Sequence, residues 1–306
     1  MKLKNKALAV LLTIALVGIL GGCAKTNNTS DSNATTPTKE ATDTATDTPA
    51  ATDTPSTENL SGTVTITGST SVDKILNDMI DEFTANNPDV TINYTGTGSS
   101  AGIADSISGA NDIGASSRNL KDDEKSAGLK ETIFAYDGIA IAVNPANPVT
   151  DISTENLAKI FSGQITNWKD VGGNDAKIVV VSREGASGTR SAFEELVKLE
   201  DAGGLTEDAT VAEGNGNVQT AVAGNENAIG YVSFSFIDNT VKALTVNGVE
   251  GTPENAKSGE YVLSRPFLFV YNDAKASAAA KAFVEFALSD DGQAFVEKHG
   301  GIKLDK

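Results

Sequence analysis

Cysteine, histidine and tryptophan are each present only once in this chain of 306 residues. The single cysteine, Cys23, has no partner for a disulfide within the chain. One cysteine and one histidine also argue against a transition-metal site, because such sites draw most of their ligands from these residue types. The carboxylates show no spacing typical of a calcium loop. We therefore expect neither a metal nor a cofactor.

Enzyme motifs are largely missing as well. The chain has no Gly-Lys dipeptide, which excludes a Walker P-loop. The segment Gly185–Thr189 lacks the final glycine of a nucleophile elbow. One alternative from this class stays open: a surface phosphatase or esterase with Ser187 as nucleophile and His299 as base. The simpler interpretation of His299 is a surface residue at a helix end, and we predict no enzymatic activity.

Acidic residues outnumber basic ones by 41 to 24, which gives a net charge of −17. Such a charge argues against nucleic acid and against anionic membrane surfaces as partners. A site for an anion in this chain must act against the long-range field of the protein. Local dipoles and a buried arginine are the means available for that.

The N-terminus has the pattern of a lipoprotein signal. A basic start is followed by the apolar run Ala7–Leu20, about fourteen residues long and short for a bilayer span. The run ends in Leu-Gly-Gly before Cys23, which predicts residues 1–22 as signal peptide and Cys23 as the lipidated residue. This places the protein at the extracellular face of the cell membrane, or in a periplasm. An uncleaved N-terminal membrane helix is the alternative.

Residues 23–61 are predicted to be a disordered tether. From Lys25 to Ser61 the chain consists mainly of Thr, Asp, Ala, Pro and Ser. Such a segment buries too little apolar surface to offset the entropy lost on ordering. The remaining part, Gly62–Lys306, is long enough for one large domain or two lobes of half that size.

The first part of this region alternates strands, polar turns and helices. Strands are expected at Thr63–Thr67, Val90–Tyr94 and Asp112–Ala115, each followed by a turn rich in serine and glycine. This order predicts an α/β layer with a largely parallel sheet. In such sheets ligands bind at the carboxyl ends of the strands, beside helix N-termini. The three turns should therefore lie at one edge.

A second α/β unit is predicted downstream, entered and left through apolar strands. Strands are expected at Gly138–Val143, Ile178–Val181 and Tyr261–Tyr271, and a helix at Arg190–Leu199. The chain is expected to close with a helix at Ala274–Leu288 and a last short helix, which a capping-box pattern at Asp290–Gln293 opens.

The strongest local signal is the segment SREGASGTR at Ser182–Arg190, between a predicted strand and a predicted helix. Ser187 and Thr189 offer hydroxyls, and N–H groups in a first helical turn have no partner within the helix. Gly188 allows close approach to the backbone. Arg183 supplies a two-pronged donor that matches a tetrahedral oxyanion.

Three further segments present the same chemistry at the same sheet edge. They are Ser69-Thr70-Ser71, Gly98-Ser99-Ser100 and Ala115-Ser116-Ser117. Each alone is usually an ordinary turn, but four together, one with an arginine, indicate an anion cradle built mainly from neutral donors.

Eight segments, in order, resemble the PstS family, the substrate-binding proteins of phosphate ABC transporters. The resemblance covers Gly62 to about Gly301 and rests on GSTSV (Gly68–Val72), GTGSSAGI (Gly96–Ile103), DIGASSRNL (Asp112–Leu120), YDGIAIAVNPANPV (Tyr136–Val149), IFSGQITNWKDVGG (Ile160–Gly173), SREGASGTRSAF (Ser182–Phe193), AIGYVS (Ala228–Ser233) and SRPFLFVYN (Ser264–Asn272).

The resemblance implies a two-lobed periplasmic-binding-protein-like type II fold, with mixed sheets, helices on both faces and phosphate in the interlobe cleft. Residues 62–140 and 262–306 then form the first lobe and residues 141–261 the second. The implied partners are inorganic phosphate and the permease subunits of an ABC transporter. Another oxyanion, such as sulfate, molybdate or a phosphonate, is the alternative ligand.

The resemblance also implies the site residues. The family's phosphate loops fall on Thr70, Ser71 and Ser99, and its arginine and helix N-terminus on Arg183, Ser187, Gly188 and Thr189. Where well-known members have an aspartate, this chain has Ser117. Asp137, just before an apolar strand, is the expected substitute that accepts the proton of phosphate.

Overall fold

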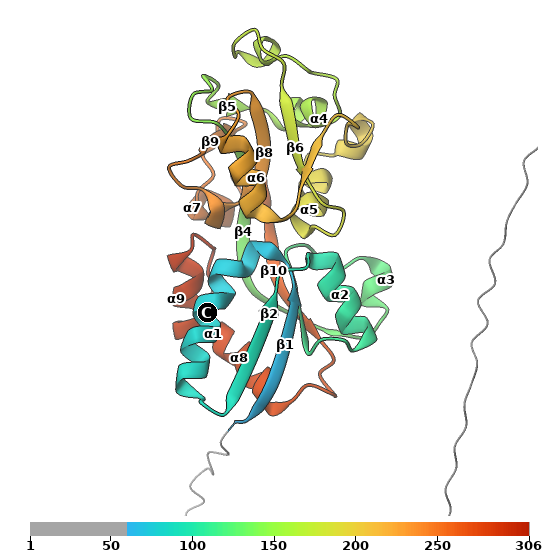
Figure 1. Ribbon diagram of the computed structural model, residues 1–306, viewed down its shortest axis with the longest axis vertical. Helices are drawn as coiled ribbons and strands as arrows, with labels where there is room; N and C mark the ends of the chain where they lie inside the picture. Colours follow the sequence, from blue (N-terminus) through green and yellow to red (C-terminus); the bar gives the residue numbers. More distant parts are fainter. Residues whose placement is uncertain (1–59, 306) are drawn as a thin grey trace, which may run out of the picture. The chain divides into compact units, whose positions relative to one another are not determined.

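The computed structural model describes residues 60–305, which form a two-lobed α/β structure (Figure 1). The predicted signal peptide, Cys23 and nearly all of the predicted tether lie outside these residues. Along 60–305, none of the helices combines the length and the apolar character needed to cross a membrane. The α/β class expected from the order of strands, turns and helices is confirmed.

The first lobe, lower in Figure 1, contains three parallel strands, because β1 pairs in parallel with both β2 and β3. Two helices from the end of the chain complete it. Its elements are β1 (Gly62–Gly68), η1 (Thr70–Val72), α1 (Asp73–Asn86), β2 (Val90–Thr95), α2 (Ser99–Ser108), β3 (Ile113–Ser116), α3 (Asp122–Lys125), α8 (Ala278–Leu288) and α9 (Asp290–Lys298).

The second lobe repeats this principle, since β6 pairs in parallel with β7 and β8. Its elements are β5 (Asp151–Ile152), α4 (Thr154–Phe161), η2 (Trp168–Val171), β6 (Val179–Arg183), α5 (Gly188–Leu196), η3 (Leu199–Ala202), β7 (Thr210–Ala212), α6 (Gly214–Ala223), β8 (Ala228–Ser233), η4 (Phe234–Phe236), β9 (Lys242–Val246) and α7 (Pro253–Ser258).

Two long strands connect the lobes: β4 (Lys130–Val143) and β10 (Ser264–Tyr271). They pair antiparallel with each other, and β4 then pairs antiparallel with β8 in the second lobe. The resulting strand order is β2-β1-β3-β10-β4-β8-β6-β7. The predicted parallel arrangement therefore holds within each lobe, whereas the connecting strands make the whole sheet mixed.

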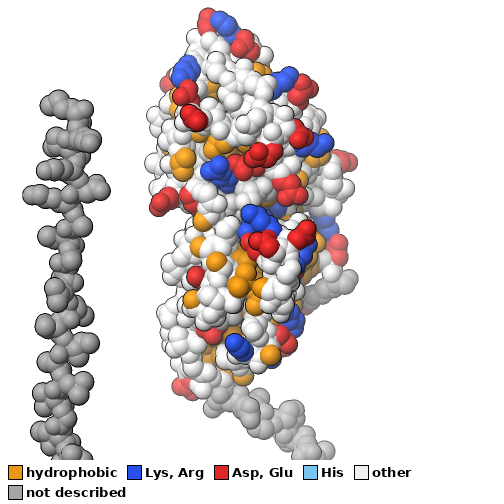
Figure 2. Space-filling model, turned by 90° about the vertical axis from the view of Figure 1, so that its right-hand side faces the viewer, with side chains coloured by type: hydrophobic (Ala, Val, Ile, Leu, Met, Phe, Trp, Pro, Cys, Tyr) orange, Lys and Arg blue, Asp and Glu red, His pale blue; other side chains and the backbone are white. Residues whose placement is uncertain are grey.

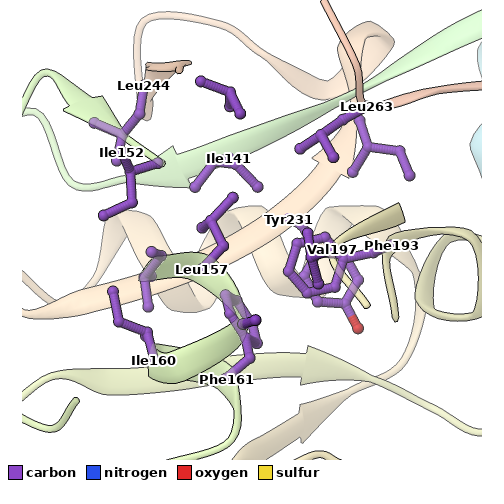
Figure 3. Close-up of a cluster of buried hydrophobic side chains, with 14 of the residues drawn as sticks. Ile141, Ile152, Leu157, Ile160, Phe161, Phe193, Val197, Tyr231, Leu244 and Leu263 are labelled. Carbon is purple, nitrogen blue, oxygen red and sulfur yellow. The ribbon is translucent and has the colours of Figure 1, made fainter. Parts of the chain in front are cut away.

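Each lobe has its own buried core. In the second lobe, Tyr231 stacks on Phe193 with ring centroids 4.2 Å apart, and Phe161 packs beside them (Figure 3). The hydroxyl of Tyr231 lies 2.8 Å from that of Ser182 and accepts from the backbone N–H of Arg183. The core thus holds the end of β6, where the strongest sequence signal begins.

Several predicted boundaries were wrong. β4 begins at Lys130, well before Gly138, because pairing with β10 orders a stretch with exposed charged residues. The predicted helix Ala274–Leu288 starts only at Ala278, where Ser277 caps it. The last helix is capped by Ser289, whose hydroxyl accepts from the N–H of Gly292.

The helix after β6 runs from Gly188 to Leu196, whereas the sequence predicted Arg190–Leu199. Ser187 provides its N-cap, which is why the helix starts two residues earlier. Trp168 is buried in the core of the second lobe, and its ring N–H donates to the carbonyl of Asn227 at 2.9 Å.

Candidate functional site

The three serine-rich turns of the first lobe meet at one edge of its sheet, as predicted. The register places Gly68 beside Ala115 and Thr67 beside Thr95, so β1, β2 and β3 end at the same level. η1 follows β1, α2 follows β2, and Ser117 follows β3. The backbone N–H of Ser117 donates to Ser99 Oγ at 3.0 Å, and the two hydroxyls are 3.2 Å apart.

The loop between β6 and α5 brings the matching residues of the second lobe. β6 ends at Arg183 and α5 begins at Gly188, so the predicted strand, loop and helix are confirmed. Ser187 Oγ accepts from the N–H of Arg190 at 3.1 Å and fixes the first turn of the helix. The helix N-terminus adds a partial positive charge at this point.

The two groups are in direct contact across the lobes. Ser71 Oγ lies 2.9 Å from Thr189 Oγ1, and Arg183 Nη2 donates to Thr70 Oγ1 at 3.0 Å. The residues predicted to form the site are therefore brought together. Asp137 joins them through Arg265, which contacts both Asp137 and Ser71. We call the following set the cradle: Thr70, Ser71, Ser99, Ser117, Arg183, Ser187, Gly188 and Thr189.

Gly188 is required by the closeness of this contact. A Cβ at position 188 would lie 2.2 Å from Ser99 Oγ and 2.7 Å from Ser117 Oγ. Both hydroxyls belong to the first lobe and are fully buried, so they have little room to move away. Only glycine permits this approach of α5 to the first lobe.

Arg183 is fully buried and held by its neighbour in sequence. Its Nε and Nη2 each donate to the carboxylate of Glu184 at 2.8 Å. Burial raises the pKa of Glu184, but the hydrogen bonds and charge of Arg183, together with the backbone N–H groups of Glu184 and Gly214, outweigh this and leave the pKa below its usual value. Glu184 is therefore ionised at neutral pH and holds the guanidinium in place.

Asp137 lies on β4 and reaches the cradle through a second arginine. Arg265, on β10, donates from Nε and Nη2 to Asp137 Oδ2 at 3.2 and 2.8 Å. The same Nη2 donates to Ser71 Oγ at 3.0 Å. Burial raises the pKa of Asp137, and the charge of Arg265 opposes that shift. Ser233 donates to the other carboxylate oxygen at 2.9 Å.

Sequence reasoning missed three buried residues around the cradle: Asn215, Ser233 and Arg265. Arg265 lies within the segment SRPFLFVYN that carried the family resemblance, so a signal was present for it. Ser233, the last residue of β8, ends AIGYVS, another of these segments, whereas Asn215 on α6 lies outside all eight. Their contacts with the cradle or with Asp137 span between 96 and 145 positions of sequence.

The structure does not support the hydrolase alternative. His299 ends α9 in the first lobe, where its Nε2 lies 2.7 Å from Asp78. Ser187, in the second lobe, is engaged as a helix cap. Because His299 is the only histidine in the sequence, Ser187 lacks an imidazole base. The described residues also hold no group of His, Cys, Asp and Glu side chains suited to a metal ion.

Comparison with known proteins gives a consistent result. Residues 38–291 match the PBP superfamily domain. The phosphate-binding protein PstS of Borreliella burgdorferi is 35% identical over 246 residues, which cover 77% of this chain and 88% of that protein. PstS of Bacillus subtilis is 37% identical over 218 residues, covering 70% of this chain and 71% of that protein.

Solved structures agree in fold. A phosphate ABC transporter substrate-binding protein from Clostridium perfringens, described as putative and solved with bound phosphate, is 47% identical with a TM-score of 0.78. The match covers 80% of this chain and 100% of that one. An ABC-type phosphate transport receptor from Vibrio cholerae is 37% identical with a TM-score of 0.68; 79% of this chain covers 100% of it. This chain therefore belongs to the PstS family of phosphate-binding proteins, within the PBP superfamily.

Proposed function

We propose that this protein captures inorganic phosphate outside the cell and delivers it to an ABC transporter, without catalysing a reaction. The observation that carries the proposal is the convergence of Arg183 and the helix N-terminus of one lobe on Thr70 and Ser71 of the other. A relative that is 47% identical was solved with phosphate bound, and another is a phosphate transport receptor.

The proposed ligands are the cradle residues. Arg183 supplies a charged donor fork, while the hydroxyls and the N–H groups of the first turn of α5 supply neutral donors. Asp137 stays in the proposed site as the residue that holds Arg265. Asp137 already accepts hydrogen bonds from Ser233, from the backbone of Phe234 and twice from Arg265, which fill the four acceptor positions of a carboxylate. To accept the proton of phosphate as well, it must give up one of them.

The two lobes are proposed to separate and close around the ligand, as in hinge-closing binding proteins. Residues 62–140 and 262–306 would move against residues 141–261, with β4 and β10 as the connection. The permease would then recognise the closed form. Ligand selectivity between phosphate and other oxyanions is proposed to depend on the carboxylate of Asp137, which repels a fully ionised anion.

Cys23 lies outside the residues that the structure describes. We propose that Cys23 carries lipid and keeps the protein at the outer face of the membrane, because it directly follows the Leu-Gly-Gly end of an apolar run. Stable anchoring takes two or more acyl chains. Cys23→Ala should release the protein from membranes or block its processing. Recovery of this variant in the membrane fraction with normal mobility would disprove the proposal.

Calorimetric titration of the purified protein with phosphate, arsenate, sulfate and a phosphate monoester tests the function. Phosphate and its isostere arsenate are expected to bind, sulfate to bind much more weakly, and the ester not to fit the closed site. Preferential binding of sulfate would assign the protein to another oxyanion. Hydrolysis of the ester would restore the enzyme alternative.

A further inference from the structure

The hydroxyl of Ser71 accepts hydrogen bonds from two groups that can only donate to it. Its Oγ lies 3.0 Å from Nη2 of Arg265 and 3.2 Å from Nδ2 of Asn215. A hydroxyl has one proton and two acceptor positions. Because two N–H groups fill both acceptor positions, Ser71 must use its proton in the 2.9 Å contact with Thr189 Oγ1, and this proton is all that it can offer to a ligand.

Thr70 is arranged in the same way. Its Oγ1 accepts from Nη2 of Arg183 at 3.0 Å and from Nδ2 of Asn215 at 3.2 Å. Asn215 thus donates to both hydroxyls with one amide nitrogen. The orientation of this amide is fixed, because its Oδ1 accepts the backbone N–H of Ser233 at 3.0 Å. That bond places the donor end of Asn215 toward Thr70 and Ser71.

Arg265 is equally fixed. Arg265 and Asp137 are 3% and 1% exposed, and Asp137 accepts two hydrogen bonds from the guanidinium. Nη1 of Arg265 donates to the carbonyl of Ser117 at 3.3 Å. An arginine does not lose its proton in a protein, so its contact with Ser71 is always that of a donor.

We propose that Asn215 and Arg265 are positioning residues that commit the Thr70 and Ser71 hydroxyls to donation, and that the cradle thereby prefers doubly charged phosphate to singly charged phosphate. This inference rests on the proposed function. Each proton on phosphate turns an acceptor oxygen into a donor, and a donor that faces a committed donor loses a hydrogen bond and is repelled. The singly charged form carries one proton more than the doubly charged form.

Five charged groups surround these hydroxyls. They are Arg183 and Glu184 at the end of β6, Asp137 on β4, Arg265 on β10 and Asp73 on α1. Burial raises the pKa of both Asp73 and Asp137, so pH can act through these carboxyls as well as through the ligand. A variant that leaves all five charges in place is therefore needed, and Asn215→Ala is that variant.

The test is calorimetric titration of phosphate at pH 6 and pH 8 with the purified protein and its variants. The wild type should bind more tightly at pH 8, where more of the phosphate is doubly charged. Asn215→Ala should lose about tenfold in affinity at pH 8, the scale of one hydrogen bond to a charged group. It should lose less affinity at pH 6, so that the ratio of its affinity at pH 8 to its affinity at pH 6 becomes smaller than in the wild type.

Asn217→Ala is the matched control, because Asn217 lies on the same helix, is exposed, and its side-chain amide donates to the carbonyl of Glu213. It should bind phosphate as the wild type does at both pH values. Thermal unfolding without phosphate shows whether each variant is folded. If Asn215→Ala is not folded, Arg265→Lys and Arg265→Gln decide: Lys, a charged donor, should retain the pH ratio better than Gln.

The inference is overturned if folded Asn215→Ala keeps the wild-type ratio between pH 6 and pH 8, or binds within threefold of the wild type. It is also overturned if the wild type binds no more tightly at pH 8 than at pH 6. Failure of the wild type to bind phosphate at either pH is a different outcome, because it refutes the proposed function itself.

Discussion

Arg183 of the second lobe donates a hydrogen bond to the hydroxyl of Thr70 in the first lobe over 3.0 Å. The contact spans 113 positions of sequence and joins the two groups of cradle residues. It occurs in a protein with a net charge of −17, whose acidic side chains are distributed over both lobes on the face in Figure 2. Anion binding here therefore depends on short-range donors, not on the overall field.

Arg183→Ala should weaken phosphate binding by roughly 2–5 kcal/mol, the scale for truncating one partner of a buried charge pair. That corresponds to about 30-fold to several thousand-fold in affinity. Arg190→Ala, on the same segment, breaks a half-buried pair with Glu194 and one hydrogen bond to the backbone carbonyl of Arg183, so it is the control and should weaken binding far less. Titration calorimetry measures both. Binding of Arg183→Ala within threefold of the wild type would remove Arg183 from the site.

Gly188→Ala should block the approach of the lobes, because the added Cβ meets two buried hydroxyls of the first lobe. We expect at least a tenfold loss of phosphate affinity and a correspondingly smaller rise in melting temperature with phosphate, since stabilisation by a ligand follows its affinity. Gly185→Ala is the matched control, with nothing within 4 Å of the new atom. Equal affinities of the two variants would contradict the close contact.

Asp137→Asn keeps the size of the side chain but replaces an acceptor oxygen with a donor. It should weaken phosphate binding and narrow the preference over sulfate by about 1–3 kcal/mol, the scale of an unsatisfied buried polar group. Competition titrations with both anions give the ratio. Asp273→Asn, at an exposed ion pair, serves as control. If Asp137→Asn still rejects sulfate as the wild type does, Asp137 acts only by holding Arg265.

Glu124 should contribute to stability in a pH-dependent way. The hydrogen bonds from Arg118 lower the pKa of Glu124 in the folded protein. A carboxyl with a lowered pKa stabilises the fold above its unfolded pKa of about 4.3 and loses this contribution as pH falls through the folded pKa. Glu124→Gln should therefore cost about 1 kcal/mol at pH 7 and little at pH 3.

Urea unfolding at the two pH values measures this difference. Glu155→Gln, which breaks a solvent-exposed pair with Lys159, should change the free energy of unfolding much less, because water screens that pair. An equal cost of Glu124→Gln at pH 7 and pH 3 would show that its effect comes from packing and not from ionisation.

The sequence predicted those parts of the site that depend on local structure. Strand, turn and helix follow one another around Ser71, Ser99 and Ser187 because alternating apolar residues, glycine and capping hydroxyls act over a few positions. Because these strands pair in parallel, their carboxyl ends, and therefore the turns that follow them, lie at one edge of the sheet.

The charge balance around the cradle could not be predicted in this way. The sequence indicated one arginine among neutral donors, whereas the structure has two, each paired with a carboxylate. Arg265 reaches Ser71 across 194 positions, and Asn215 reaches it across 144. Such contacts depend on how β10 and α6 pack in the complete fold, and no local pattern encodes them.

A crystal structure of the protein with phosphate tests the central claim most directly. The account predicts a tetrahedral anion between the lobes, within hydrogen-bonding distance of Thr70 and Ser71 on one side and of Arg183 and Thr189 on the other. Density for phosphate that contacts only one lobe, or that lies away from these four side chains, would contradict it.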